Sequence, residues 1–286
     1  MKVLPSVFVN VLTALSVLQS STALPFINKQ NVLIKALPPG GANPVLSNNA
    51  AKIAGALAFT EGTYMALAPS LSLKMHGVDE VTNPTNMMIL RRTGLCILNL
   101  GVYVYCLIFN DFRVQTPFAI NALLFIADSL SSLMNQDSKT IGPSNKLDLS
   151  FLAVTGSAAY AALNDLECFN PLFKAFSVYT TICGILDYFA PQQAIKLFES
   201  EEAADADTPG VVHIIGNCCL VLGTLTASLA WGVDVIQAVG YSALASAILD
   251  IKSMFFTPEV EAMDMNKYSL MVGPLWNAGI AAAILV

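Results

Sequence analysis

Long apolar segments follow one another from residue 51 to the end of the chain, and they restrict its possible folds more than any other feature. Each is about 16 to 23 residues long, close to the length with which an α-helix crosses a bilayer. Only 12% of the residues are charged, against about 25% in a soluble domain. We therefore predict an all-α polytopic membrane protein with about eight transmembrane helices, at residues 51–69, 87–109, 115–134, 149–164, 170–190, 210–231, 234–256 and 268–286.

The second half of the apolar region repeats the first at a constant spacing of 122 residues. Ala68-Pro69 matches Ala190-Pro191 at this spacing, and Asp128 matches Asp250 without any gap in between. The same spacing joins Gly62 to Gly184, Gly94 to Gly216 and Gly101 to Gly223. Small residues let membrane helices approach closely, so these glycines predict helix–helix contacts. We predict two four-helix repeats, at residues 51–164 and 170–286, which are parallel because each contains an even number of helices.

The residues ahead of the first repeat have the pattern of a targeting region. Residues 1–23 combine a basic start, an apolar core and small residues at a cleavage point, as in a signal peptide, although an uncleaved helix is the alternative. Residues 24–50 contain no acid, and Pro38-Pro39-Gly40-Gly41 and Asn43-Pro44 are expected to prevent regular structure, which predicts a flexible linker over the whole stretch. An acid-poor segment behind a signal also resembles the plastid-targeting leaders of algae with secondary plastids. The pattern predicts insertion through the secretory pathway, with a plastid membrane as one destination.

Four carboxyl groups fall inside the predicted spans, where ionisable groups are costly and need a reason. Glu61 and Asp187 lie in the first helices of the two repeats, and Asp128 and Asp250 lie in the third helices. One interpretation is a polar cavity between the repeats, in which these acids relay a proton or hold a ligand. The alternative is structural, with the two third-helix acids paired to Arg91, Arg92 or Lys252 near the headgroups. We favour the structural role for the Asp128 and Asp250 pair and the functional role for Glu61.

Two basic residues open the second helix of the first repeat. They are Arg91 and Arg92, and His213 and Ile214 take their places in the second repeat. Arg91, Arg92 and His213 are candidates for contact with an anionic headgroup or ligand. The alternative is that the arginines simply flank a span on the cytosolic side.

Other site chemistries lack a signature in the sequence. The two histidines have no partner at metal-ligand spacing, and no phosphate-binding loop, nucleophile elbow or dinucleotide fingerprint occurs. No basic patch with interleaved aromatic residues suggests a nucleic-acid partner. The acidic stretch at 199–207 is expected to be a solvated connector. Because most cysteines fall in apolar spans, no disulfide is expected. We predict no catalytic residue, cofactor or metal.

The order of Gly62, Ala68-Pro69 and Gly77, followed by Arg92-x-Gly94 at the start of the next span, resembles the DoxX-like small four-helix membrane proteins. In the second repeat Ile214 replaces the arginine. The resemblance implies a tandem duplication of such a unit. Because that family has no single activity, it implies no functional residue.

These observations leave three classes of function. The first is a non-catalytic accessory or assembly protein that acts in the lipid bilayer with other membrane proteins. The second is a transporter or carrier of a small solute or lipid, with its site between the repeats, and parallel duplication is a known transporter plan. The third is a membrane-embedded lipid-modifying enzyme, which would need an acid–base set such as His213 with Asp250.

Overall fold

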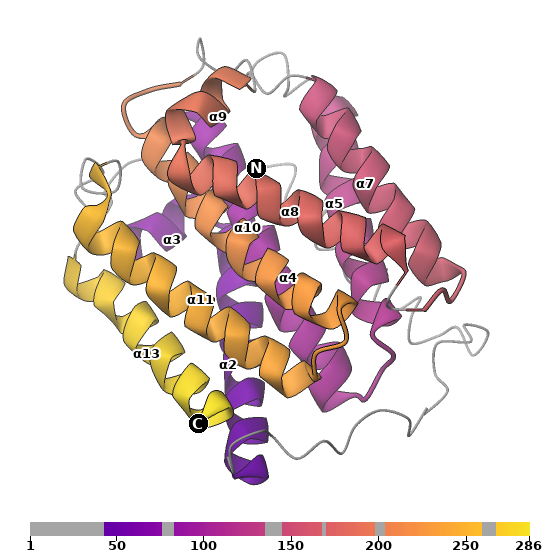
Figure 1. Ribbon diagram of the computed structural model, residues 1–286. Helices are drawn as coiled ribbons and strands as arrows, with labels where there is room; N and C mark the ends of the chain where they lie inside the picture. Colours follow the sequence, from indigo (N-terminus) through magenta and orange to yellow (C-terminus); the bar gives the residue numbers. More distant parts are fainter. Residues whose placement is uncertain (1–42, 76–82, 135–144, 168–169, 198–203, 259–266) are drawn as a thin grey trace.

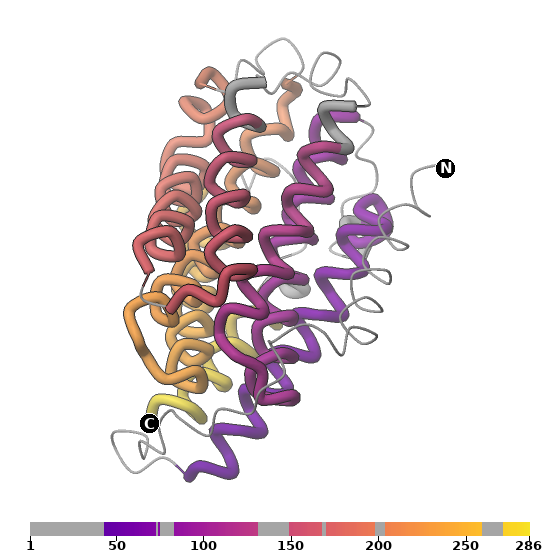
Figure 2. The backbone as a smooth tube through the Cα atoms, turned by 90° about the vertical axis from the view of Figure 1, so that its right-hand side faces the viewer, coloured from indigo at the N-terminus to yellow at the C-terminus, as the bar shows by residue number. Residues whose placement is uncertain are grey.

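The computed structural model describes residues 43–75, 83–134, 145–167, 170–197, 204–258 and 267–286. All regular elements in these ranges are helical, and the long helices run roughly lengthwise through an elongated bundle (Figure 1, Figure 2). The long helices are α2 (Pro44–Leu67), α4 (Pro84–Val104), α5 (Gln115–Met134), α7 (Asn145–Leu163), α8 (Pro171–Phe189), α10 (Thr208–Ala230), α11 (Val235–Phe256) and α13 (Lys267–Leu285). The all-α prediction is confirmed for the described residues, and each predicted apolar segment overlaps one of these helices.

Three of the helical segments are long and apolar enough to cross a membrane, namely Pro84–Phe109, Thr208–Ala230 and Val235–Phe256. The first of them includes a π-helical turn, η2 (Tyr105–Phe109), which extends α4. Leu149–Leu163 and Met271–Leu285 are shorter apolar helices. The structure is thus compatible with an integral membrane protein. The predicted signal at 1–23 and residues 24–42 of the predicted linker lie outside the described residues.

Asparagine followed by proline starts three of the helices. The side chain of Asn43 accepts hydrogen bonds from the backbone at Val45 and Leu46, and Asn83 and Asn170 cap α4 and α8 in the same way. An Asn cap satisfies free backbone N–H groups, and proline is well tolerated in the first turn. The prediction that Asn43-Pro44 prevents regular structure was therefore wrong, because this pair begins a helix seven residues before the expected boundary at 51.

Proline also ends the first helix of each half. Helix α2 ends at Leu67 and the short helix α3 (Pro69–Met75) begins two residues later, while α8 ends at Phe189 ahead of α9 (Pro191–Leu197). Proline cannot donate the backbone hydrogen bond that would continue the first helix. The two halves thus share a long helix, a break and a short helix at the same spacing.

The closest helix contacts lie where the sequence predicted them, at glycines. A Cβ atom on Gly62 of α2 would lie 2.1 Å from the backbone nitrogen of Leu98 in α4, and one on Gly94 would lie 2.3 Å from that of Ala66. In the other half, a Cβ on Gly216 of α10 would lie 2.4 Å from the backbone nitrogen of Tyr188. The pairs α2–α4 and α8–α10 therefore approach backbone to backbone, as small residues allow.

The remaining contacts interleave the two halves of the chain. Helices α5 and α7 pack together, as do α11 and α13, while α4 and α10 meet at the centre. The first helix of each half, however, packs on the last helix of the other, so that α8 contacts α7 and α2 contacts α13. A hydrogen bond from Ser47 Oγ to the carbonyl oxygen of Ala283, 3.1 Å long, joins α2 to α13. Figure 1 shows the indigo start of α2 beside the yellow end of the chain.

Candidate functional site

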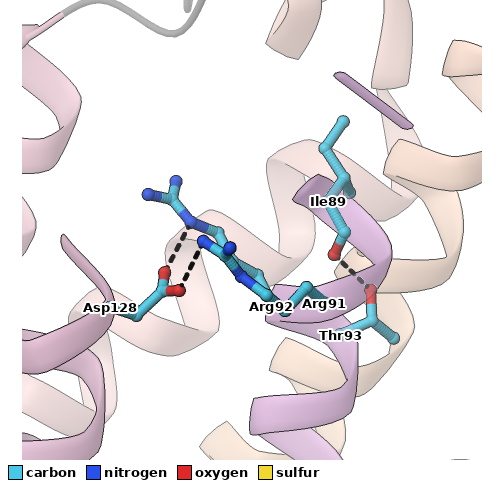
Figure 3. Close-up of polar contacts among 5 residues, drawn as sticks. All are labelled: Ile89, Arg91, Arg92, Thr93 and Asp128. Atoms are coloured by element: carbon cyan, nitrogen blue, oxygen red, sulfur yellow. Dashed lines mark hydrogen bonds and ion pairs between the residues drawn. The ribbon is translucent and has the colours of Figure 1, made fainter. Parts of the chain in front are cut away.

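Asp128 of α5 is held by both arginines of α4. Arg91 Nη2 donates to Asp128 Oδ1 at 2.8 Å, and Arg92 Nε donates to Oδ2 at 3.0 Å. Figure 3 shows the two guanidinium groups converging on the one carboxylate. Asp128 is only 7% exposed, and a buried carboxylate needs such partners. The alternative in which Asp128 pairs with Arg91 and Arg92 therefore matches the structure, and both oxygens of this acid are engaged.

A cavity of about 130 Å³ lies beside this ion pair, between the two halves of the chain. Arg92 and Asp128 line it from α4 and α5, and Asp187 lines it from α8. Most other lining groups are apolar, including Met88, Phe125, Phe151 and Ile215. A cavity of about 150 Å³ with an apolar lining can hold benzene. This one has a comparable size and adds polar groups at its wall.

Asp187 is the acid in this cavity that lacks a partner. It is 7% exposed, and its Oδ1 has no hydrogen-bond partner among the residues that the structure describes. A buried polar atom without a partner costs about 1 to 3 kcal/mol, and more when charged. The position of Asp187 in a cavity wall means that a bound molecule could supply the missing donor.

Two groups that the sequence did not connect with a site also line the cavity. Three aromatic rings lie side by side, with centroids 5.0 Å apart for Phe125 and Phe151 and 6.0 Å apart for Phe151 and Tyr179. Three thiols face it as well, and the Sγ atoms of Cys96 and Cys219 are 3.9 Å apart. In the sequence these residues are ordinary apolar positions, so only their spatial convergence reveals them.

The described cysteines are all free, as the sequence predicted. They are Cys96, Cys106, Cys183, Cys218 and Cys219, whereas Cys168 lies outside the described residues. The expectation that thiols in the spans pack as small hydrophobic groups holds for Cys96 and Cys106, which are both buried.

Glu61 and Asp250 form a separate group, away from the cavity. Asn217 Nδ2 donates to Asp250 Oδ1 at 2.5 Å, and Ser246 Oγ donates to Oδ2 at 3.1 Å. Glu61 interacts electrostatically with Asp250, and its side chain is exposed on the surface of the molecule. The structure thus divides the four acids into two pairs, one of which lines the cavity. The predicted convergence of all four on a single site does not occur.

His213 takes a structural role, so its expected contact with a lipid headgroup was wrong. The residue is 1% exposed and its ring stacks on Tyr188. Its Nδ1 lies 2.8 Å from the carbonyl oxygen of Tyr188, and Nε2 lies 2.8 Å from Ser253 Oγ. Because a carbonyl only accepts, Nδ1 is the donor. With both nitrogens engaged in the core, the imidazole reaches no headgroup and forms no hydrogen bond with Asp250.

The acidic connector ahead of α10 is tied to the first half of the chain. Asp205 Oδ1 accepts from Asn86 Nδ2 at 2.9 Å and from the backbone nitrogen of Thr208 at 3.0 Å. Burial alone would raise the pKa of Asp205, but hydrogen bonds from Asn86, Thr208 and Asn83 outweigh it and hold the pKa below its ordinary value. The connector is therefore more than a solvated loop, because one of its acids joins the starts of α4 and α10.

No model of a protein family, no curated protein and no solved structure matches this chain.

Proposed function

We propose that the chain crosses the membrane eight times, in two parallel four-helix repeats. The support is the constant spacing of 122 residues between matching positions. The packing is also equivalent, since α2–α4 corresponds to α8–α10 and α5–α7 to α11–α13. The same proposal extends to a duplicated unit of the DoxX-like kind, and to insertion through the secretory pathway, with a plastid membrane as one destination. Both of these rest on sequence patterns.

Side-specific labelling tests this topology. Lys74 and Lys196 are exposed in the short helices α3 and α9, which follow the first helix of each repeat. In a cysteine-free background, Lys74→Cys and Lys196→Cys should react with an impermeant maleimide from the same side of the membrane. Val45→Cys, at the opposite end of α2, should react from the other side. Opposite labelling of positions 74 and 196 would contradict parallel repeats.

The function that the geometry favours is that of a carrier, which holds a small, largely apolar solute or lipid in the cavity between the repeats. The observation that supports it is Asp187, whose Oδ1 lacks a donor in the wall of this cavity. Folding gains nothing from a buried acid without a partner, so such a group indicates binding. The ion pair at Asp128 forms a second polar part of the wall, and both oxygens of this acid are already engaged.

Photolabelling of the full chain in lipid vesicles tests occupancy of the cavity. The probe is a medium-chain alcohol that carries a diazirine, with mass spectrometry to map the labelled residues. We expect label on cavity residues such as Met88 and Phe151 in the parent and loss of that label in Ile215→Trp, which fills the cavity. Ile214→Trp is the matched control, because Ile214 is a half-buried neighbour that does not line the cavity. Equal labelling of the cavity in both variants, or none in the parent, would reject the carrier.

A second candidate is the accessory or assembly protein, which Glu61 favours. An exposed carboxyl in a predicted span is costly in lipid unless a neighbour supplies a donor. A partner helix with a basic or amide side chain would do so. A photocrosslinking residue at exposed Leu57, one turn from Glu61, should then capture a membrane protein in native membranes, and Glu61→Gln should reduce that capture. The lipid-modifying enzyme has no comparable support, because both ring nitrogens of His213 are engaged with Tyr188 and Ser253 in the core.

A further inference from the structure

An acid and three aromatic rings line the cavity of the proposed carrier. Phe125, Phe151 and Tyr179 come from α5, α7 and α8, and all three line the cavity with Asp187. The ring planes of Phe125 and Phe151 are nearly perpendicular, at 87°. Tyr179 is held by a hydrogen bond of 2.8 Å between its hydroxyl and Ser150 Oγ. The aromatic wall is thus built from both repeats, and its rings are fixed by packing and by a polar contact.

The two acids of the cavity differ in what they can still accept. Both oxygens of Asp128 receive guanidinium hydrogen bonds, so this carboxylate is already compensated. Asp187 is equally buried and has an oxygen without a partner among the described residues. A ligand therefore gains most by placing a donor at Asp187 Oδ1.

The three aromatic rings favour one of the two ligand groups that could donate a hydrogen bond to Asp187, a hydroxyl or an ammonium group. A hydroxyl group would satisfy Asp187 but would gain little from the rings beyond apolar contact. An ammonium group would also be attracted to aromatic rings, because the negative face of a ring attracts a cation. An aromatic lining with a carboxylate is a combination that suits organic cations, because the charge is compensated on one side and the apolar body is covered on the other.

We propose that the cavity selects an apolar amine, with Asp187 as the counter-ion of its ammonium group and Phe125, Phe151 and Tyr179 as the wall around it. This inference rests on the carrier function proposed above. It adds the chemical class of the ligand, which that function leaves open.

Two probes that differ only in the polar group test the inference. They are a medium-chain diazirine amine and the diazirine alcohol of the same chain, each applied to the full chain in vesicles. In the parent, the amine should label the cavity at a concentration at least about tenfold lower than the alcohol, since 1.4 kcal/mol corresponds to a factor of ten. Asp187→Asn keeps the shape but removes the charge, and it should abolish this preference. Asp187→Glu should retain part of it, and Phe151→Leu should weaken amine labelling of the other cavity residues more than alcohol labelling of the same residues.

The outcomes separate this inference from the function on which it rests. If amine and alcohol label the cavity equally, and Asp187→Asn changes neither, the cavity binds ligands but the amine assignment is wrong. If neither probe labels the cavity in the parent, the carrier itself is rejected. The comparison of the two probes in the parent needs no variant, so it decides the question even if Asp187→Asn does not fold.

Discussion

Asp128 and Asp250 occupy the same position in the two halves of the chain, yet their surroundings differ in charge. Asp128 faces two guanidinium groups, from Arg91 and Arg92. At the matching positions the second half has His213, which turns into the core, and Ile214. Asp250 is instead surrounded by the neutral donors Asn217 and Ser246.

The difference shows two ways of keeping an acid inside an apolar bundle. Ionic compensation binds Asp128 firmly and leaves both of its oxygens engaged. The neutral network around Asp250 extends further, because Asn277 Nδ2 donates to Ser246 Oγ at 3.0 Å and Glu61 lies close enough to interact. The first half therefore has an acid held by two arginines at the wall of a cavity. The second half has an acid held by hydrogen bonds from neutral side chains.

The largest effect is expected from removing the charge of Asp128. Asp128→Asn leaves two partly buried guanidinium groups without their anion, and breaking such a pair costs about 3 to 5 kcal/mol. Thermal unfolding of the detergent-purified protein should show a lower transition temperature. The triple variant Asp128→Asn, Arg91→Met, Arg92→Met should regain much of the loss, because no uncompensated charge remains. A transition temperature for Asp128→Asn equal to that of the parent would mean that the ion pair does not stabilise the fold.

A smaller, pH-dependent effect is expected at the starts of α4 and α10. Asn83 and Asp205 are 122 residues apart, the spacing that also joins Gly62 to Gly184. Asn83 accepts a hydrogen bond from the first turn of α4, and Asp205 accepts one from the first turn of α10. The folded pKa of Asp205 is lowered, so its stabilisation is present above the unfolded pKa of about 3.9 and is lost as the pH falls through the folded value. Asp205→Ala removes the acceptor that the starts of both helices share and should cost about 1 kcal/mol at neutral pH.

The matched control for this pH dependence is Asp205→Asn, which makes the second half resemble the first. The Asn side chain keeps an oxygen that can accept from the backbone nitrogen of Thr208, but it has no group that titrates. Unfolding measured from neutral pH down to the acidic range should lose part of its pH dependence in this variant. Identical pH profiles for Asp205→Asn and the parent would show that Asp205 does not contribute to acid sensitivity.

The smallest effect is expected at Asp250. Asp250→Asn retains an oxygen for Asn217 and an amide for Ser246, so the free energy of unfolding should change by less than about 1 kcal/mol. Comparison with Asp128→Asn under the same conditions sharpens the contrast between the two halves. A loss at Asp250 as large as that at Asp128 would require an ionic partner for Asp250, contrary to the neutral surroundings described here.

The sequence predicted the helices far better than it predicted the site. Apolar length, the prolines at 69 and 191 and the glycines at 62 and 94 are local signals, and each has a direct steric or hydrogen-bonding meaning. The meeting of Asp128 with Arg91 and Arg92 could also be anticipated, because a buried acid needs a cation. The start of α2 was misplaced because the capping effect of Asn43 was read as a break.

The cavity could not be predicted, because it depends on how the two halves of the chain pack together. Asp187 joins Asp128 only because α8 packs on α7 of the other half, and Glu61 is kept away by the equivalent contact of α2 with α13. Phe125, Phe151 and Tyr179 are far apart in the chain and have no motif. Their role emerges from the three-dimensional arrangement alone.

The contact between α2 and α13 has a consequence for biosynthesis. Helix α2 is the first of the described helices to leave the ribosome and α13 is the last, yet Ser47 bonds to Ala283 across their interface. Helix α2 must therefore remain without this neighbour until translation is almost complete. A ribosome that stops before residue 267 releases a chain in which α2 keeps its contact with α4 but lacks α13, and such a truncated chain should be a substrate for cellular quality control.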